Sequence, residues 1–190
     1  MDAIVTLCNR ALDLIGADPI MSLDDENKSA RLCKRNYPIS RDLVLRSYPW
    51  NCAMQRTFLP ALSIAPLWGY KKSFPLPVGP EPLYCIRLYK VISDQDYKLE
   101  NGCILSNDQA PLPILYIGRI LNPLDFDPLL AEAIALRLAI YLASNLVESS
   151  PKIELIRGYF REIIAEARII DAQENSAEDL TITSWLESRY

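Results

Sequence analysis

The chain has 190 residues, of which 50% are hydrophobic and 23% are charged. This composition excludes a protein that is disordered throughout, and the length fits one globular domain with or without a tail. The net charge of −4 has the wrong sign for a protein that binds nucleic acid through a broad surface. The chain contains no histidine, which removes the commonest metal ligand and every nucleophile that relies on a histidine base.

The five cysteines lie at positions 8, 33, 52, 85 and 103. They are too far apart in the sequence for a CxxC redox pair or a zinc knuckle, so we interpret them as reduced and mostly buried side chains. Phosphate-binding motifs rich in glycine are also absent from the sequence. We therefore expect no cofactor and no metal.

Two helices are predicted in the first quarter of the chain. Apolar residues at helical spacing predict the first over residues 2–16, with Gly16 ending it. Three acids, Asp24, Asp25 and Glu26, lie at the start of a second helical pattern over residues 25–47. We interpret them as favouring the positive end of that helix, in preference to a cation site or an acid–base pair. Pro38 predicts either a kink or two short helices that meet there.

Residues 48–82 contain a Tyr-Pro-Trp-Asn turn and then six prolines between positions 60 and 82. The prolines exclude a helix and predict an extended arm that wraps the protein without joining its core. Trp50 has two interpretations that remain open. It is either a plug for the helical core or, with the arm, part of a recognition groove for another chain.

Residues 84–118 are predicted to form a small antiparallel sheet. Residues 84–92 are rich in β-branched and aromatic side chains. Residues 97–100 and 103–105 flank an Asn-Gly pair, which is typical of a type I′ hairpin turn. Residues 114–118 would complete the sheet.

The last third is predicted to be helical. Asp125 or Asp127 can cap a helix over residues 127–147, with Pro128 at its first position. Residues 129–147 are apolar enough to suggest a membrane span, but Glu132 and Arg137 favour a core helix, so no membrane span is expected. A final helix over residues 151–173 should pair with it antiparallel.

The expected fold is therefore α+β and mainly α. It is an antiparallel bundle of about four helices with a small antiparallel sheet or hairpin insertion and an extended C-terminal tail. Residues 1–175 form the single helical domain, with the arm and β insertion at about 50–120. We interpret residues 176–190 as a docking tail in preference to a frayed end, because an apolar group on a polar segment has little to bury against within its own domain.

Basic residues recur along the second predicted helix, at Arg31, Lys34, Arg35, Arg41 and Arg46. They could face phosphates, but the nearby acids favour a solvated face or a strip of salt bridges between subunits. We expect Arg31, Arg35, Arg41 and Asp42 at such a subunit interface.

The sequence resembles the phage tail tubular protein A family, the head-to-tail adaptors of short-tailed phages. The likeness begins with ALDLIGADPI at residues 11–20 and covers essentially the whole chain through many weak motifs in the same order. The other matching segments are residues 22–27, 30–33, 46–51, 74–77, 116–117, 131–142, 166–168, 171–174 and 184–186.

The resemblance implies a structural virion protein with no catalytic residue. Its subunits would self-associate into a ring, dodecameric on the portal protein, from a chain that can be monomeric when free. The ring would sit in the virion tail at the head–tail interface, carry the tail nozzle of tubular protein B type, and let genome DNA pass without specific binding. Assembly would take place in the bacterial host cytoplasm. The helices at 2–16, 25–47, 127–147 and 151–173 would form the ring wall. The sheet at about 84–118 would face the tail. Ile182, Trp185, Leu186 and Arg189 would dock on the portal.

Two other functions stay open. One is a tail-associated cell-wall hydrolase that uses a carboxylate pair. Its candidates are Asp24, Asp25, Glu26, Asp94, Asp96 and Glu132. The other is a non-viral helical interaction module.

Overall fold

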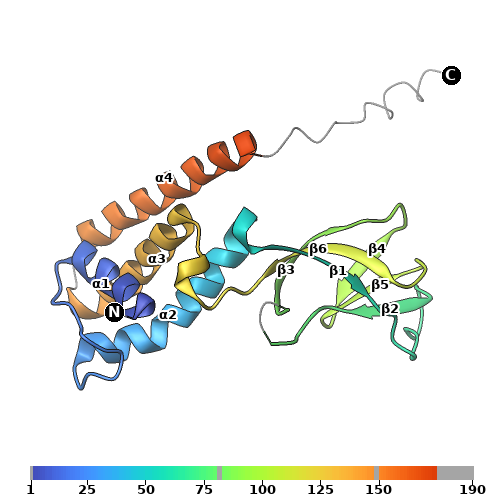
Figure 1. The fold of residues 1–190 in the computed structure, drawn as a ribbon, viewed down its shortest axis with the longest axis horizontal. Helices are drawn as coiled ribbons and strands as arrows, with labels where there is room; N and C mark the ends of the chain where they lie inside the picture. The colour runs from blue at the N-terminus through green and yellow to red at the C-terminus, as the bar shows by residue number, and fades with distance from the viewer. Residues whose placement is uncertain (1, 81–82, 148–149, 175–190) are drawn as a thin grey trace.

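The computed structural model describes residues 2–80, 83–147 and 150–174 and shows an elongated molecule (Figure 1). One end is a helical module of α1 (Ala3–Ile15), α2 (Lys28–Ser47), α3 (Pro128–Leu146) and α4 (Ser150–Glu174). The other end is a β module of β1 (Met54–Leu59), β2 (Lys72–Pro75), β3 (Cys85–Val91), β4 (Tyr97–Glu100), β5 (Cys103–Ser106) and β6 (Leu112–Gly118). The 3-10 turn η1 (Asn51–Ala53) links α2 to β1, and η2 (Pro123–Asp125) links β6 to α3 and contacts α1.

Local signals at the helix ends explain where the helices begin and stop. Gly16 ends α1 in the left-handed conformation, with φ 71°, and Asp127 caps α3 by accepting from the Leu129 amide at 2.8 Å. Both predictions are confirmed. The N-cap of α2 is Asn27, and the predicted acids lie in the loop before it. Pro38 lies inside α2, which continues through it as one helix. Of the two predicted alternatives, two short helices are therefore wrong, and the kink stays a prediction.

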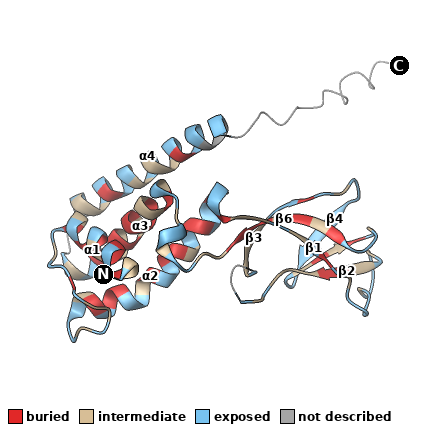
Figure 2. Ribbon diagram, viewed as in Figure 1, coloured by how far each residue is buried: buried red, intermediate tan, exposed pale blue. Residues whose placement is uncertain are grey.

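The helical core is built around α3, which contacts α1, α2 and α4. Every α3 residue from Leu129 to Ala143 is buried or half-buried, as Figure 2 shows, because three helices surround it. Of the described helices, α3 alone is long and apolar enough to cross a membrane, and 50% of its apolar window is buried inside the protein. That burial agrees with its interpretation as a core helix.

The β module has its own core between two antiparallel sheets, ordered β1-β6-β3 and β2-β5-β4. Alternate residues of β6 point into this core, where they meet Phe74 of β2 and Ile104 of β5, both fully buried. Asn101 and Gly102 have φ values of 47° and 71°, which confirms the predicted hairpin turn between β4 and β5.

The predicted architecture of a helical bundle with a small hairpin insertion is wrong. The fold is α+β, but its six strands form two three-stranded sheets with a core of their own. The proline-rich arm contributes β2, whose Phe74 is a core residue, and β1 begins directly after η1. Both strands pair with partners far along the chain, Met54 with Ile117 and Phe74 with Ile104, which local patterns do not reveal.

Candidate interaction surfaces

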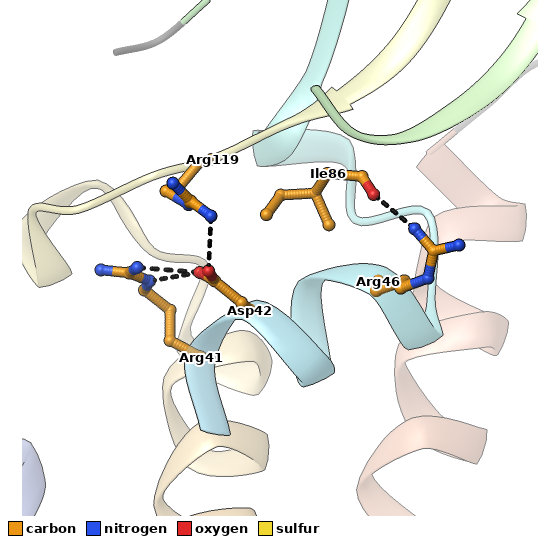
Figure 3. Close-up of polar contacts among 5 residues, drawn as sticks. All are labelled: Arg41, Asp42, Arg46, Ile86 and Arg119. Carbon is orange, nitrogen blue, oxygen red and sulfur yellow. Dashed lines mark hydrogen bonds and ion pairs between the residues drawn. The ribbon is translucent and has the colours of Figure 1, made fainter. Parts of the chain in front are cut away.

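The two modules are pinned together where α2 meets β3. The Arg46 side chain, in the last turn of α2, donates from Nη1 to the Ile86 carbonyl oxygen at 2.6 Å (Figure 3). In return, Arg87 Nη1 donates to the Arg46 carbonyl oxygen at 2.9 Å. This reciprocal pair satisfies a helix-end carbonyl and fixes the direction in which the β module leaves the helices.

Asp42 joins the modules a second time, because its carboxylate binds two arginines (Figure 3). Arg41 Nη2 lies 2.8 Å from Oδ1, and Arg119 Nη2 lies 2.8 Å from Oδ2. Arg119 follows β6 and its guanidinium carbon stacks 3.8 Å from the ring centroid of Tyr84. The cluster therefore ties α2 to the segment that leads from the β module back to α3.

A groove of about 610 Å³ opens beside this cluster, and we call it the junction groove. Its walls are α2, β3 and residues next to β2 and on β4, so both modules contribute to it. Its apolar lining is Ile39, Leu43, Leu76, Ile86, Leu88 and Leu99. Cys85 also lines it, and burial raises the pKa of that thiol to about 11, so the thiol is a poor nucleophile at neutral pH.

A second groove, of about 600 Å³, runs between α1 and α3. Small side chains, Ala3, Ala131 and Ala135, leave the space. Arg10 crosses it to Glu132, with Nη2 to Oε1 at 2.8 Å and Nε to Oε2 at 3.1 Å, and this pairing raises the pKa of the arginine.

Three of the most exposed apolar side chains of the described residues lie on the loop between β1 and β2, and we call residues 61–71 the β tip. β1 leads away from the helices, so the β tip lies at the far end of the β module (Figure 1). Ile64, Leu67 and Trp68 are 80%, 92% and 81% exposed. Three large apolar side chains this exposed on one loop are typical of a surface that another molecule covers.

The structure exposes some of the predicted interface residues and buries another. Arg31 and Arg35 are exposed on α2 and available to a neighbour. Arg41 is only 6% exposed, and it pairs with Asp42 within the same chain. Arg119 was missed by the sequence reasoning, although it is the only base between residues 99 and 136. Whether any of these residues meets another subunit stays a prediction.

The predicted carboxylate candidates lie in separate parts of the fold. Asp24 pairs with Lys34 at 2.6 Å, which lowers the pKa of the acid, and Asp25 accepts from the amides of Met21 and Ser22. Asp94 and Asp96 lie in the turn between β3 and β4. Within residues 2–80, 83–147 and 150–174, no group of three or more acids or cysteines could hold a metal ion.

Trp50 is buried, and its indole Nε1 donates to the Val44 carbonyl oxygen at 3.1 Å. The interpretation as a plug for the helical core is therefore confirmed. The prediction of mostly buried cysteines holds for Cys8 and Cys33, whereas Cys52 is exposed. The predicted docking residues of the tail lie outside the described part of the chain. They are Ile182, Trp185, Leu186 and Arg189.

A scan against models of protein families and a search of curated proteins found no match to this chain.

Proposed function

We propose that the chain is a structural virion protein, a head-to-tail adaptor similar to phage tail tubular protein A. The observation that carries this proposal is the β tip, where Ile64, Leu67 and Trp68 are left in water. Exposing apolar area costs about 25 cal/mol per Å², so a protein retains such a surface where a partner buries it. The separate core of the β module supports the same view, because the tip extends from a module that packs around a core of its own.

In this proposal the helical module forms the ring wall, with Arg31 and Arg35 on an exposed face towards the next subunit. The β module carries its apolar tip towards the tail nozzle. The segment at 176–190, with Ile182, Trp185, Leu186 and Arg189, binds the portal. Genome DNA passes through the ring without specific binding, and the chain catalyses no reaction.

The test mixes the full chain with portal rings from the same virus and follows sedimentation and electron microscopy. We expect a portal complex with an added ring, to which the nozzle protein then binds. Replacing Trp185 and Leu186 with alanine should abolish the portal complex. A chain that stays monomeric with the portal and the nozzle contradicts the proposal, as does clearing of peptidoglycan in a zymogram.

The β tip is tested separately from portal binding. The double substitution Leu67→Asp and Trp68→Asp should leave the portal complex intact and abolish nozzle recruitment, because two charges cannot enter an apolar contact. Met21→Asp is the matched control, since Met21 is 86% exposed but lies on the helical module. If the parent chain, the double variant and Met21→Asp bind the nozzle equally, the β tip is not the nozzle-binding surface.

A further inference from the structure

The junction groove has the chemistry of a binding site for an apolar segment. Leu43 of α2 and Leu99 of β4 are 39% and 50% exposed, although both line a concave surface. Ile39, one turn before Leu43, is 51% exposed on the same helix face. An occupant that covered these side chains would gain the free energy of burying them.

The groove is also positively charged. Arg46, Arg87 and Arg119 line it against a single acid, Asp42. Arg46 and Arg119 both line the groove. Figure 3 shows Arg46 donating to the Ile86 carbonyl oxygen and Arg119 donating to Asp42. A guanidinium carries five N–H donors, so Arg46, which gives one from Nη1 to Ile86, keeps others for a carboxylate of an occupant. The groove therefore favours a segment that combines apolar and acidic residues.

The chain itself supplies such a segment close by. The last described residue, Glu174, accepts through Oε2 from Asn51 Nδ2 at 3.3 Å. Asn51 begins η1, just after α2 ends at Ser47, and Arg46 in the last turn of α2 lines the groove. The end of α4 is thus next to the end of α2, which forms one groove wall.

The 16 residues after Glu174 match the groove in charge and in apolar content. Glu178 and Asp179 precede Leu180 and Ile182, and Trp185 and Leu186 follow. An extended chain spans about 3.3 Å per residue, so the four residues to Glu178 cover up to roughly 13 Å. That reach exceeds the spacing of about 10 Å between packed helices or sheets.

We propose that the junction groove binds residues 178–186 of the same chain. The acids lie against the arginines at the rim, and the apolar side chains cover Ile39, Leu43 and Leu99. Tethering supports this choice of occupant, because a short linker gives an effective concentration in the millimolar range. The groove then competes with any other protein that binds this segment, so the free chain holds its docking residues back until a stronger partner removes them.

The experiment uses the full chain carrying Leu43→Cys and measures the alkylation rate of the introduced thiol by peptide-resolved mass spectrometry. A groove that is occupied about 80% of the time slows alkylation about fivefold. Replacing Trp185 and Leu186 with alanine should remove that protection. Replacing Glu178 and Asp179 with lysine should also remove the protection. In the chain with an unaltered tail, high salt should weaken the protection, because salt screens the charge pairs. Ile64→Cys on the β tip is the control, and its rate should not respond to any of these changes.

Equal alkylation of the Leu43→Cys thiol with the unaltered tail and with both altered tails would overturn the proposal. Protection that appears only at high protein concentration would overturn it as well, because it would assign the groove to a neighbouring copy. The inference does not require the proposed adaptor function. Portal binding is read separately by sedimentation, so either proposal can fail while the other stands.

Discussion

Removing Asp42 should destabilise the protein more than removing any exposed acid. The Asp42 carboxylate lies 2.8 Å from both Arg41 and Arg119. The Arg41 side chain is 8% exposed, whereas those of Asp42 and Arg119 are 29% and 26% exposed. Asp42→Ala therefore leaves one buried and one half-buried guanidinium without the charge that pairs with them.

The magnitude follows from the exposure of the cluster. Breaking a fully buried pair costs about 3–5 kcal/mol. An exposed pair is worth about 0–1 kcal/mol. With Arg41 buried but Arg119 partly solvated, we expect Asp42→Ala to lower the free energy of unfolding by about 2 kcal/mol. For a chain of this length the melting temperature should fall by roughly 4–8 °C.

The assay is urea denaturation followed by far-ultraviolet circular dichroism and tryptophan fluorescence, whose transitions must coincide for a two-state analysis. Asp24→Ala is the matched control. It removes an ion pair with Lys34 at 2.6 Å whose side chains are 80% and 63% exposed, so the denaturation midpoint should stay close to that of the parent chain.

A double-mutant cycle with Arg119→Ala tests the reasoning directly. Asp42 and Arg119 should show a coupling energy of at least about 0.5 kcal/mol. If Asp42→Ala and Asp24→Ala lower stability equally, or if the cycle shows no coupling, the junction cluster does not hold the modules together.

Three further predictions concern the helix cap, a buried phenol and the β core. Asn27 accepts from the Ala30 amide at 2.7 Å, so Asn27→Ala should lower the free energy of unfolding in urea by about 1 kcal/mol, and no loss would contradict its capping role. Tyr37 is buried, with no hydrogen-bond partner for its hydroxyl among the described residues, so Tyr37→Phe should leave stability at pH 7 unchanged or raise it by up to about 1 kcal/mol. Burial raises the pKa of Tyr37 from 10.0 to about 12, so between these values the unfolded chain loses the proton first, and stability falls as pH rises. Tyr37→Phe should flatten this fall in denaturation series at pH 9–12, and an unchanged slope would refute the assignment. Phe74→Ala should lower the local stability of the β module by about 3–5 kcal/mol. Amide hydrogen exchange should then become faster in β2 and β5 but not in α3. Equal acceleration in α3 would show that the two modules share one core.

The amino-acid sequence by itself determined the features that depend on neighbouring residues. Gly16 ends α1, Asp127 caps α3 and the Asn-Gly pair turns the β4–β5 hairpin, because each acts through its own backbone or through amides a few residues away. The apolar run of α3 likewise identified the helix that the others surround, since a helix without a polar face must be covered.

Tertiary structure decided what depends on residues far apart in the chain. Phe74, in a segment that six prolines mark as extended, is a core residue only because β5 lies beside it. Asp42 and Arg119 meet across 77 positions, and the junction groove exists only where α2 packs beside β3. Strand pairing and charge clusters of this kind are set by the packing of whole modules, so local propensity and periodicity carry no trace of them.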